Sequence, residues 1–183
     1  GGDYPNNNFG NYQKATKSGY KFEDMNANGE WDADEPVIAG WTIYVDGTDG
    51  AGNPVSDSTT TDADGKYEFS LVPGTYTISE DLPTDWFQSF PASGEYVDEV
   101  FVSGGDYPNN NFGNYRNATK SGYKFEDMNA DGNWDADEPA LEGWTIEVHD
   151  FSSGAFVAST TTDADGKYEF SLKPGRYLIS EVM

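Results

Sequence analysis

The feature that most constrains this chain is a long internal repeat. Residues 1–12 return unchanged at 104–115, an offset of 103 residues. From Ser58, which aligns with Ser159, the offset is 101, so the second copy lacks two residues in a segment that we expect to be a surface loop. Two copies of ordinary domain length predict a tandem array of one kind of module.

The repeat divides the chain into three parts. We expect residues 16–115 to form one complete module and residues 116–183 a second module that is truncated at its C-terminal end. Residues 1–12 duplicate the end of a module, so residues 1–15 are either the final strand of a preceding repeat or a strand donated to a neighbouring subunit. We favour the preceding repeat, because one donated strand would leave other parts of the second module unreplaced.

Within a module the pattern is all-β. Apolar and polar residues alternate over 67–71 and again over 76–80, on either side of a Pro-Gly pair, which predicts a hairpin. Further strands are expected at 86–88, 96–102 and 111–115. About seven short strands per module and no helical period indicate a two-sheet sandwich.

A twelve-residue pattern with the spacing of an EF-hand calcium loop occurs once in each copy. A calcium ion takes six to eight hard oxygen ligands, and a short loop supplies them only by winding around the ion, with glycine at the sharpest turn. The residues at ligand positions are Asp24, Asn26, Asn28, Glu30 (backbone carbonyl), Asp32 and Glu35, then Asp127, Asn129, Asp131, Asn133 (backbone carbonyl), Asp135 and Glu138. The alternative, a polar surface turn that binds nothing, is disfavoured by two full matches.

The flanks of the loop have the composition of strands rather than helices. Residues 18–22 precede the first loop and residues 40–45 follow it, and both segments are rich in aromatic and β-branched residues. Pro36 stands where an exiting helix would begin. We therefore predict a calcium clip between two strands and not a calcium-sensing helix pair.

Charge excludes several classes of partner. The 183 residues carry 33 Asp and Glu against 10 Lys and Arg, a formal net charge of −23, which disfavours nucleic acid and anionic membranes. There is no cysteine, and no apolar run approaches the ~20 residues of a membrane span. No arrangement of nucleophile and base is recognisable, so we expect no catalytic site and no enzyme.

Several segments together resemble the serine-aspartate-repeat-protein B-type (SdrD B-like) module, which is related to collagen-adhesin B domains. They are Tyr20–Asp24, the loop ending Glu35-Pro36, Ala39–Ile43, Thr61–Phe69, Pro73–Glu80 and Phe112–Tyr115. The resemblance implies prealbumin-like (Ig-like Greek-key) sandwiches in an extracellular, calcium-rigidified stalk or filament. Such a stalk presents an adhesive tip or links subunits, with neighbouring repeats or subunits as partners.

The resemblance further implies an internal isopeptide bond between a strand Lys and a final-strand Asn beside a buried Glu. Glu80 and Asn114 match the acid and the Asn. With Tyr20 and Phe22 facing inward, Lys21 would point outward, and Tyr20 would fill the lysine position of the family. Two alternatives are open: a bulge turns Lys21 inward to bond Asn114, or Tyr20, Glu80 and Asn114 form a buried hydrogen-bonded cluster, which we favour.

Two further features have competing interpretations. Asp62 and Asp64 could ligate another calcium ion, but turn geometry is the preferred account of this Asp-Gly segment. Trp41 alternates with apolar residues and is assigned to the core, whereas Trp86 is expected to be exposed, where it would stack on sugars. The second function class is therefore a carbohydrate-binding accessory module of a secreted enzyme.

Overall fold

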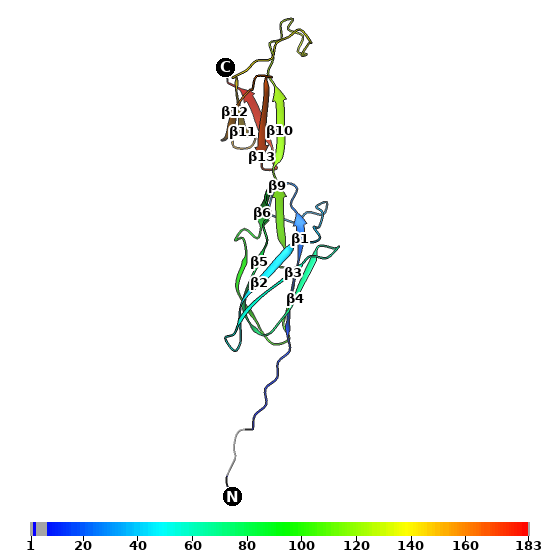
Figure 1. Ribbon diagram of the computed structural model, residues 1–183, viewed down its shortest axis with the longest axis vertical. Helices are drawn as coiled ribbons and strands as arrows, with labels where there is room; N and C mark the ends of the chain where they lie inside the picture. Colours follow the sequence, from blue (N-terminus) through cyan, green and yellow to red (C-terminus); the bar gives the residue numbers. More distant parts are fainter. Residues whose placement is uncertain (1, 3–6, 183) are drawn as a thin grey trace. The chain divides into compact units, whose positions relative to one another are not determined.

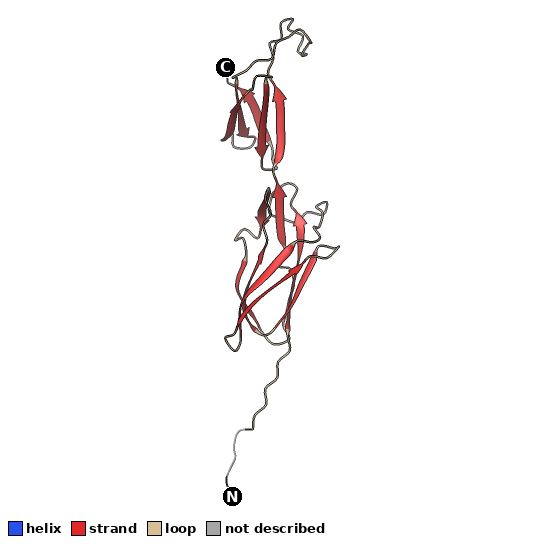
Figure 2. Ribbon diagram, viewed as in Figure 1, coloured by secondary structure: helices blue, strands red, loops and turns tan. Residues whose placement is uncertain are grey.

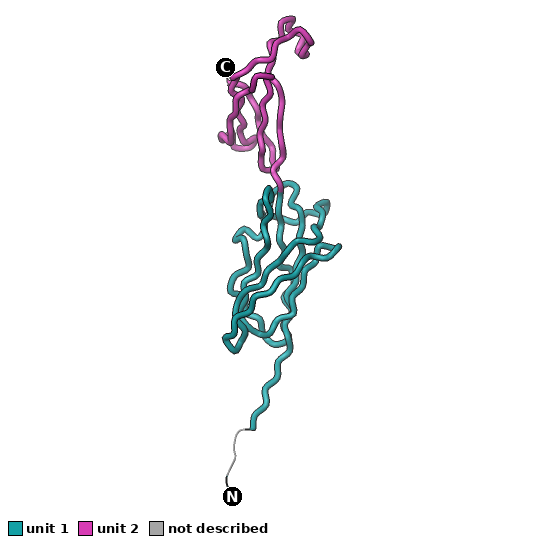
Figure 3. The backbone as a smooth tube through the Cα atoms, in the orientation of Figure 1, with its two compact units in different colours: residues 1–115 teal, residues 116–183 magenta. Residues whose placement is uncertain are grey.

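The chain folds entirely into strands, turns and loops in the part that is described. The computed structural model describes residues 2 and 7–182. All regular structure in these residues is β-strand (Figure 2), which confirms the predicted all-β class. None of the described residues therefore belongs to a helix long and apolar enough to span a bilayer. Two compact units are present, residues 1–115 and residues 116–183 (Figure 3).

Unit 1 contains two sheets built from the strands of Figure 1. The first sheet has the order β4-β1-β9-β6, with β8 also paired to β1, and the second has the order β3-β2-β5-β7. The strands are β1 (Ala15–Glu23), β2 (Thr42–Asp49), β3 (Pro54–Thr60), β4 (Lys66–Leu71), β5 (Gly74–Glu80), β6 (Trp86–Phe90), β7 (Tyr96–Phe101), β8 (Asp106–Tyr107) and β9 (Phe112–Arg116). No sequence pattern indicated β8, which has only two residues.

The core of unit 1 lies between these sheets. In β4 the apolar residues Tyr67, Phe69 and Leu71 are buried while the intervening polar residues are exposed, as period-2 alternation requires. Strands of both sheets contribute to one cluster, each large side chain adding about 1.5–3 kcal/mol of burial free energy. Its members are Ala15, Trp41, Ile43, Val45, Tyr67, Phe69, Leu71, Tyr76, Ile78, Phe101 and Phe112.

The predicted hairpin of residues 67–71 and 76–80 is wrong. β4 pairs with β1, whereas β5 pairs with β2 and β7, so the two strands belong to different sheets. Val72 and Pro73 carry the chain from one sheet to the other. Alternation correctly identified which side chains are buried, but it contains no information about which strand lies beside which.

Unit 2 has the same kinds of strands in two smaller sheets. β10 (Ala118–Tyr123) pairs with β13 (Lys167–Leu172), and β11 (Thr145–Asp150) lies between β12 (Phe156–Thr161) and β14 (Tyr177–Glu181). Its buried cluster consists of Ile146, Val148, Phe170 and Leu172.

The N-terminal duplicate lies only partly within the described residues. Residues 1 and 3–6 are outside them, and residues 7–14 form no strand and are exposed. The predicted strand in residues 1–15 therefore has no counterpart among the described residues before Ala15, where β1 begins.

Candidate functional site

The first loop with calcium-ligand spacing connects β1 to β2. Its carboxylates are held by the backbone of the loop itself. The two carboxylate oxygens of Asp24 accept hydrogen bonds from the backbone N–H groups of Asn28 (3.1 Å) and Gly29 (2.8 Å). Those of Glu35 accept from Met25 (2.8 Å) and Asp32 (3.1 Å). The first and last positions of the pattern are therefore both turned into the loop.

The middle positions of this loop face Asp32. The side-chain amides of Asn26 and Asn28 donate to Oδ2 of Asp32 at 2.8 and 3.0 Å. Glu30 donates its backbone N–H to Oδ1 of Asn28, and Gly29 adopts a positive φ of 79°, which glycine accommodates without strain. The positive ends of two amide dipoles thus point at a carboxylate in the interior of the loop.

The second loop repeats this arrangement between β10 and β11. Asp127 accepts from the backbone N–H groups of Asp131 and Gly132, and Glu138 accepts from those of Met128 and Asp135. The amide of Asn129 donates to Asp135 at 2.9 Å, and Asn133 donates its backbone N–H to Asp131. The two twelve-residue sequences differ at two positions, Asn28/Asp131 and Glu30/Asn133, and fold into the same loop.

Among the described residues, no three or more His, Cys, Asp or Glu side chains are grouped as a metal site made of these residue types alone would require. The twelve-residue pattern takes up to half of its oxygens from Asn side chains and a backbone carbonyl, which such a group does not include. The donor types of both loops match the hard oxygens that calcium prefers.

A tryptophan in each loop covers the preceding strand. The ring of Trp31 stacks on Phe22, with centroids 5.3 Å apart and an interplanar angle of 10°, and lies 5.5 Å from the ring of Tyr20. In unit 2, Trp134 stacks on Phe125 in the same way. The aromatic residues of β1 at positions 20 and 22 are thus covered by the loop and do not face the space between the sheets.

This arrangement corrects the expected orientation of Lys21. Lys21 points into the core and is fully buried, whereas Tyr20 is only half-buried. The reason is that both faces of β1 are covered, so the aromatic residues take the face under the loop and the opposite face carries Ala15, Lys17, Gly19 and Lys21. No bulge is needed, and Tyr20 is not part of the buried polar cluster.

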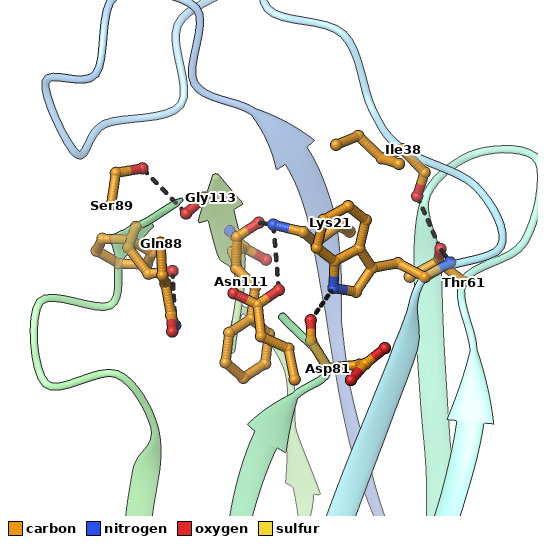
Figure 4. A network of polar contacts seen from close by, with 12 residues as sticks. Lys21, Ile38, Thr61, Asp81, Gln88, Ser89, Asn111 and Gly113 are labelled. Carbon is orange, nitrogen blue, oxygen red and sulfur yellow. Dashed lines mark hydrogen bonds and ion pairs between the residues drawn. The ribbon is translucent and has the colours of Figure 1, made fainter. Parts of the chain in front are cut away.

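The cluster consists of Lys21 on β1, Glu80 on β5 and Asn114 on β9. The Nζ of Lys21 lies 3.2 Å from Oε2 of Glu80 and donates a hydrogen bond of 3.2 Å to the carbonyl oxygen of Phe112 (Figure 4). β9 runs parallel to β1 with Phe112 opposite Lys21, and Asn114 shares its face with Phe112. The side chains of Lys21 and Asn114 therefore lie on the same side of the sheet.

Burial dominates the electrostatics of this cluster. Desolvation lowers the pKa of Lys21 to about 8 against the opposing effect of Glu80, and it raises the pKa of Glu80 to about 7 against that of Lys21. Both carboxylate oxygens of Glu80 and both amide atoms of Asn114 are buried without a hydrogen bond of regular geometry to the described residues. Burying polar atoms without hydrogen bonds is costly.

The indole of Trp41 forms one wall of the cluster. The Nζ of Lys21 lies 4.5 Å from the ring centroid, and Nε1 of Trp41 donates to the carbonyl oxygen of Asp81 at 2.8 Å (Figure 4). Trp41 is buried, as expected. Sequence reasoning missed its contact with Lys21.

Unit 2 contains only part of such a cluster in its described residues. Lys124 and Glu181, the counterparts of Lys21 and Glu80, form an ion pair of 2.8 Å, and Lys124 lies over the ring of Trp144. The lysine and glutamate side chains are 25% and 38% exposed, in contrast to 0% and 1% in unit 1. Solvent screening makes this second pair an ordinary surface ion pair.

Two other expectations concern Trp86 and Asp62, and the structure corrects the first. Trp86 is not an exposed platform: it is partly buried and packs against the core, with its ring perpendicular to that of Trp41 at 5.2 Å. Oδ1 of Asp62 accepts hydrogen bonds of 2.9 Å from the backbone N–H groups of Asp64 and Lys66, the geometry of a turn. This turn joins β3 to β4, in different sheets, and not the arms of a hairpin.

Comparison with known proteins gives a family match across both units. The model of the SdrD B-like domain matches residues 18–108 and 121–182. Serine-aspartate repeat-containing protein D of Staphylococcus aureus (strain Newman) is 33% identical over 172 residues, which cover 87% of this chain and 13% of that protein. Serine-aspartate repeat-containing protein F of Staphylococcus epidermidis is likewise 33% identical over 87% of the chain, and the chain spans 10% of its length.

Among solved structures, a streptococcal ancillary pilin is similar at 15% identity and a TM-score of 0.41, covering 92% of this chain and 54% of the pilin. A structural similarity at this level does not indicate a shared function. The chain thus corresponds to a small part of much longer curated relatives.

Proposed function

The chain belongs to the SdrD B-like domain family, and on this premise we propose that it is a non-catalytic, calcium-rigidified structural segment that presents an adhesive tip or links subunits. It is an extracellular, cell-surface module. We propose neighbouring repeats or subunits of the same protein as its partners, with strand donation by residues 1–12 as the alternative to simple tandem contact.

The observation that carries the calcium proposal is the burial of two carboxylates in one loop. Asp24 is 0% exposed and Glu35 is 8% exposed. Within the described residues neither forms an ion pair with Lys or Arg. Backbone N–H groups are the partners of both carboxylates, so no positive side chain of the described residues offsets their charge. Burying such a charge is unfavourable, and the chain already has a net charge of −23. A divalent cation held by Asp24, Asn26, Asn28, Asp32, Glu35 and the carbonyl of Glu30 would supply the missing positive charge.

The loop is joined to the sandwich at several points, so a bound ion would stabilise more than the loop. Asp24 donates its backbone N–H to the carbonyl oxygen of Asn114 on β9, and Glu23 donates to Pro36 at the end of the loop, both at 2.8 Å. Binding that occurs only in the folded state adds about 2.7 kcal/mol at a ligand concentration 100 times Kd. One residue, Asn117, separates β9 from β10. Rigid loops and a short connection would together limit bending between modules.

The test compares thermal unfolding and calcium binding in matched variants. The double variants Asp24→Ala/Glu35→Ala and Asp127→Ala/Glu138→Ala each remove the terminal ligands of one loop. We expect calorimetry to show two binding sites in the parent chain and one in each variant, with calcium raising the unfolding temperature only of the unit whose loop is intact. Titration with Mg²⁺ provides the control for unspecific charge neutralisation. Equal unfolding in calcium and in chelator, without binding heat, would refute the calcium proposal.

We also propose that Lys21 and Asn114 form an isopeptide bond. The Nζ of Lys21 would attack Cγ of Asn114, the Cγ–Nδ2 bond would break, and Glu80 would transfer the proton from Nζ to the departing ammonia. The lowered pKa of the Lys21 amine and the raised pKa of the Glu80 carboxyl group favour this step, because both shifts increase the neutral form of each group near neutral pH. The bond would satisfy the amide of Asn114 and remove the buried charge of Lys21.

A further inference from the structure

A second buried lysine on β1 has surroundings that resemble those of Lys21. Lys17 is 1% exposed, and its Nζ pairs with Oε2 of Glu99 on β7. The other carboxylate oxygen, Oε1 of Glu99, accepts a hydrogen bond of 3.0 Å from Nδ2 of Asn110, which is itself buried. One carboxylate therefore contacts both a lysine amine and an asparagine amide.

The position of Asn110 is determined by contacts of its backbone. Its N–H donates to the carbonyl oxygen of Ser18 at 3.2 Å, and its own carbonyl oxygen accepts from the hydroxyl of Tyr67 at 2.6 Å. Gly19 permits this approach, because a Cβ there would collide with the carbonyl oxygen of Asn110. Asn110 is thus fixed against β1, close to Lys17.

Apolar walls enclose the lysine. The Nζ of Lys17 lies 5.5 Å from the ring centroid of Tyr96 and 5.6 Å from that of Phe101. Burial lowers the pKa of Lys17, although Glu99 opposes the shift. The side chain of Glu99 keeps 29% of its surface exposed, so a small product released at this point has a route to solvent.

The lysine and the asparagine of the Lys17 group are each four residues before the lysine and the asparagine of the Lys21 group. Lys17 and Lys21 are four residues apart on one face of β1, and Asn110 and Asn114 are four residues apart on the segment that runs parallel beside it. At about 3.3 Å per residue the two groups are separated by roughly 13 Å, so each can react without the other.

We propose that Lys17, Glu99 and Asn110 form a second isopeptide site, in which Nζ of Lys17 becomes bonded to Cγ of Asn110. The Cγ–Nδ2 bond breaks, Glu99 accepts a proton from Nζ and delivers it to Nδ2, and ammonia leaves. No oxidant, metal or cofactor takes part, and atoms and charge balance. The site extends the bond proposed for Lys21 and Asn114, and it would join β1 to the segment before β9 at the opposite end of their pairing.

Chymotryptic mapping of the purified chain distinguishes the two bonds. Tyr20 lies between the two lysines and Phe112 between the two asparagines, so cleavage at aromatic residues places each bond in its own linked peptide. We expect the intact mass to be lower than that of the unmodified chain by two ammonia molecules, with residues 13–20 linked to residues 102–112, because Pro108 blocks cleavage after Tyr107.

Conservative variants show which residues are responsible for each loss of ammonia. Lys17→Arg keeps a positive charge near Glu99 but has no amine nucleophile, and Glu99→Gln removes the proton carrier; each should reduce the loss to one ammonia. Lys120→Arg, at the exposed counterpart of Lys17 in unit 2, should leave the loss at two.

Recovery of the Lys17 and Asn110 peptides unlinked from the parent chain would overturn the second site, even if the Lys21–Asn114 peptide is linked. Conversely, a linked Lys17–Asn110 peptide beside unlinked Lys21 and Asn114 would support the second site and refute the first.

Discussion

Replacement of Gly113 by alanine would test how closely the last strand of unit 1 approaches the strand beside it. A Cβ at Gly113 would lie 2.7 and 2.9 Å from Cε2 and Cε1 of Phe22, and closer still to Cζ. The ring of Phe22 is 1% exposed and stacks on Trp31, so it cannot move away without disturbing the loop. Overpacking of this kind costs about 1–3 kcal/mol, and the less flexible unfolded chain offsets roughly 0.5–1 kcal/mol.

The net loss should therefore be about 1–2 kcal/mol. For a unit of about 100 residues this corresponds to a decrease in Tm of roughly 4–16 °C. Differential scanning calorimetry in calcium would measure it on the transition of unit 1, while that of unit 2 stays in place. The matched control is Gly10→Ala, in the same Phe-Gly-Asn-Tyr sequence, where a Cβ would meet no atom within 4 Å. If both variants melt like the parent chain, the close packing of Phe22 on β9 is refuted.

Two further predictions concern the same strand. Phe112→Ala removes a fully buried ring that contacts Tyr67 and Tyr96 and should destabilise unit 1 by about 3–5 kcal/mol in urea unfolding, whereas Phe9→Ala, at the 93% exposed duplicate position, should have no measurable effect. In Asn114→Ala, which cannot form the Lys21 bond, the raised pKa of Glu80 should make the unfolding free energy fall as pH rises from about 4.5 to about 7, because the folded state holds this proton more tightly than the unfolded state. Urea titrations across that range should show the decrease and should lose it when Glu80→Gln is added; a decrease of the same size in the double variant would contradict the assignment to Glu80.

Sequence reasoning was reliable where the signal is local. Alternation in β4 and β5, the turn residues and the lack of a helical period depend on a few neighbouring residues, and the structure confirms the all-β class. The burial of Trp41 followed from the same alternation. The position of the twelve-residue loops between strands also follows from their flanking sequences.

Sequence reasoning failed where strand pairing and side-chain packing depend on segments far apart in the chain. The hairpin expected from β4 and β5 became two strands in separate sheets, because pairing is decided by all the strands that compete for an edge. Trp86 was expected in solvent, but the ring of Trp41 lies against it. Neither the strand pairing nor the packing of Trp86 on Trp41 can be recognised from the local sequence of the segments involved.

The sequence by itself determined the repeat, the all-β class, the calcium-ligand spacing and two members of the Lys21 cluster, Glu80 and Asn114. Only the tertiary structure decided which face of β1 is the inner one. Trp31 covers Tyr20 and Phe22 from the loop side, and this turns Lys17 and Lys21 into the space between the sheets, where Glu99 and Glu80 meet them. A strand has two faces of equal period, so its pattern cannot say which face is inner until the segments that cover both are in place.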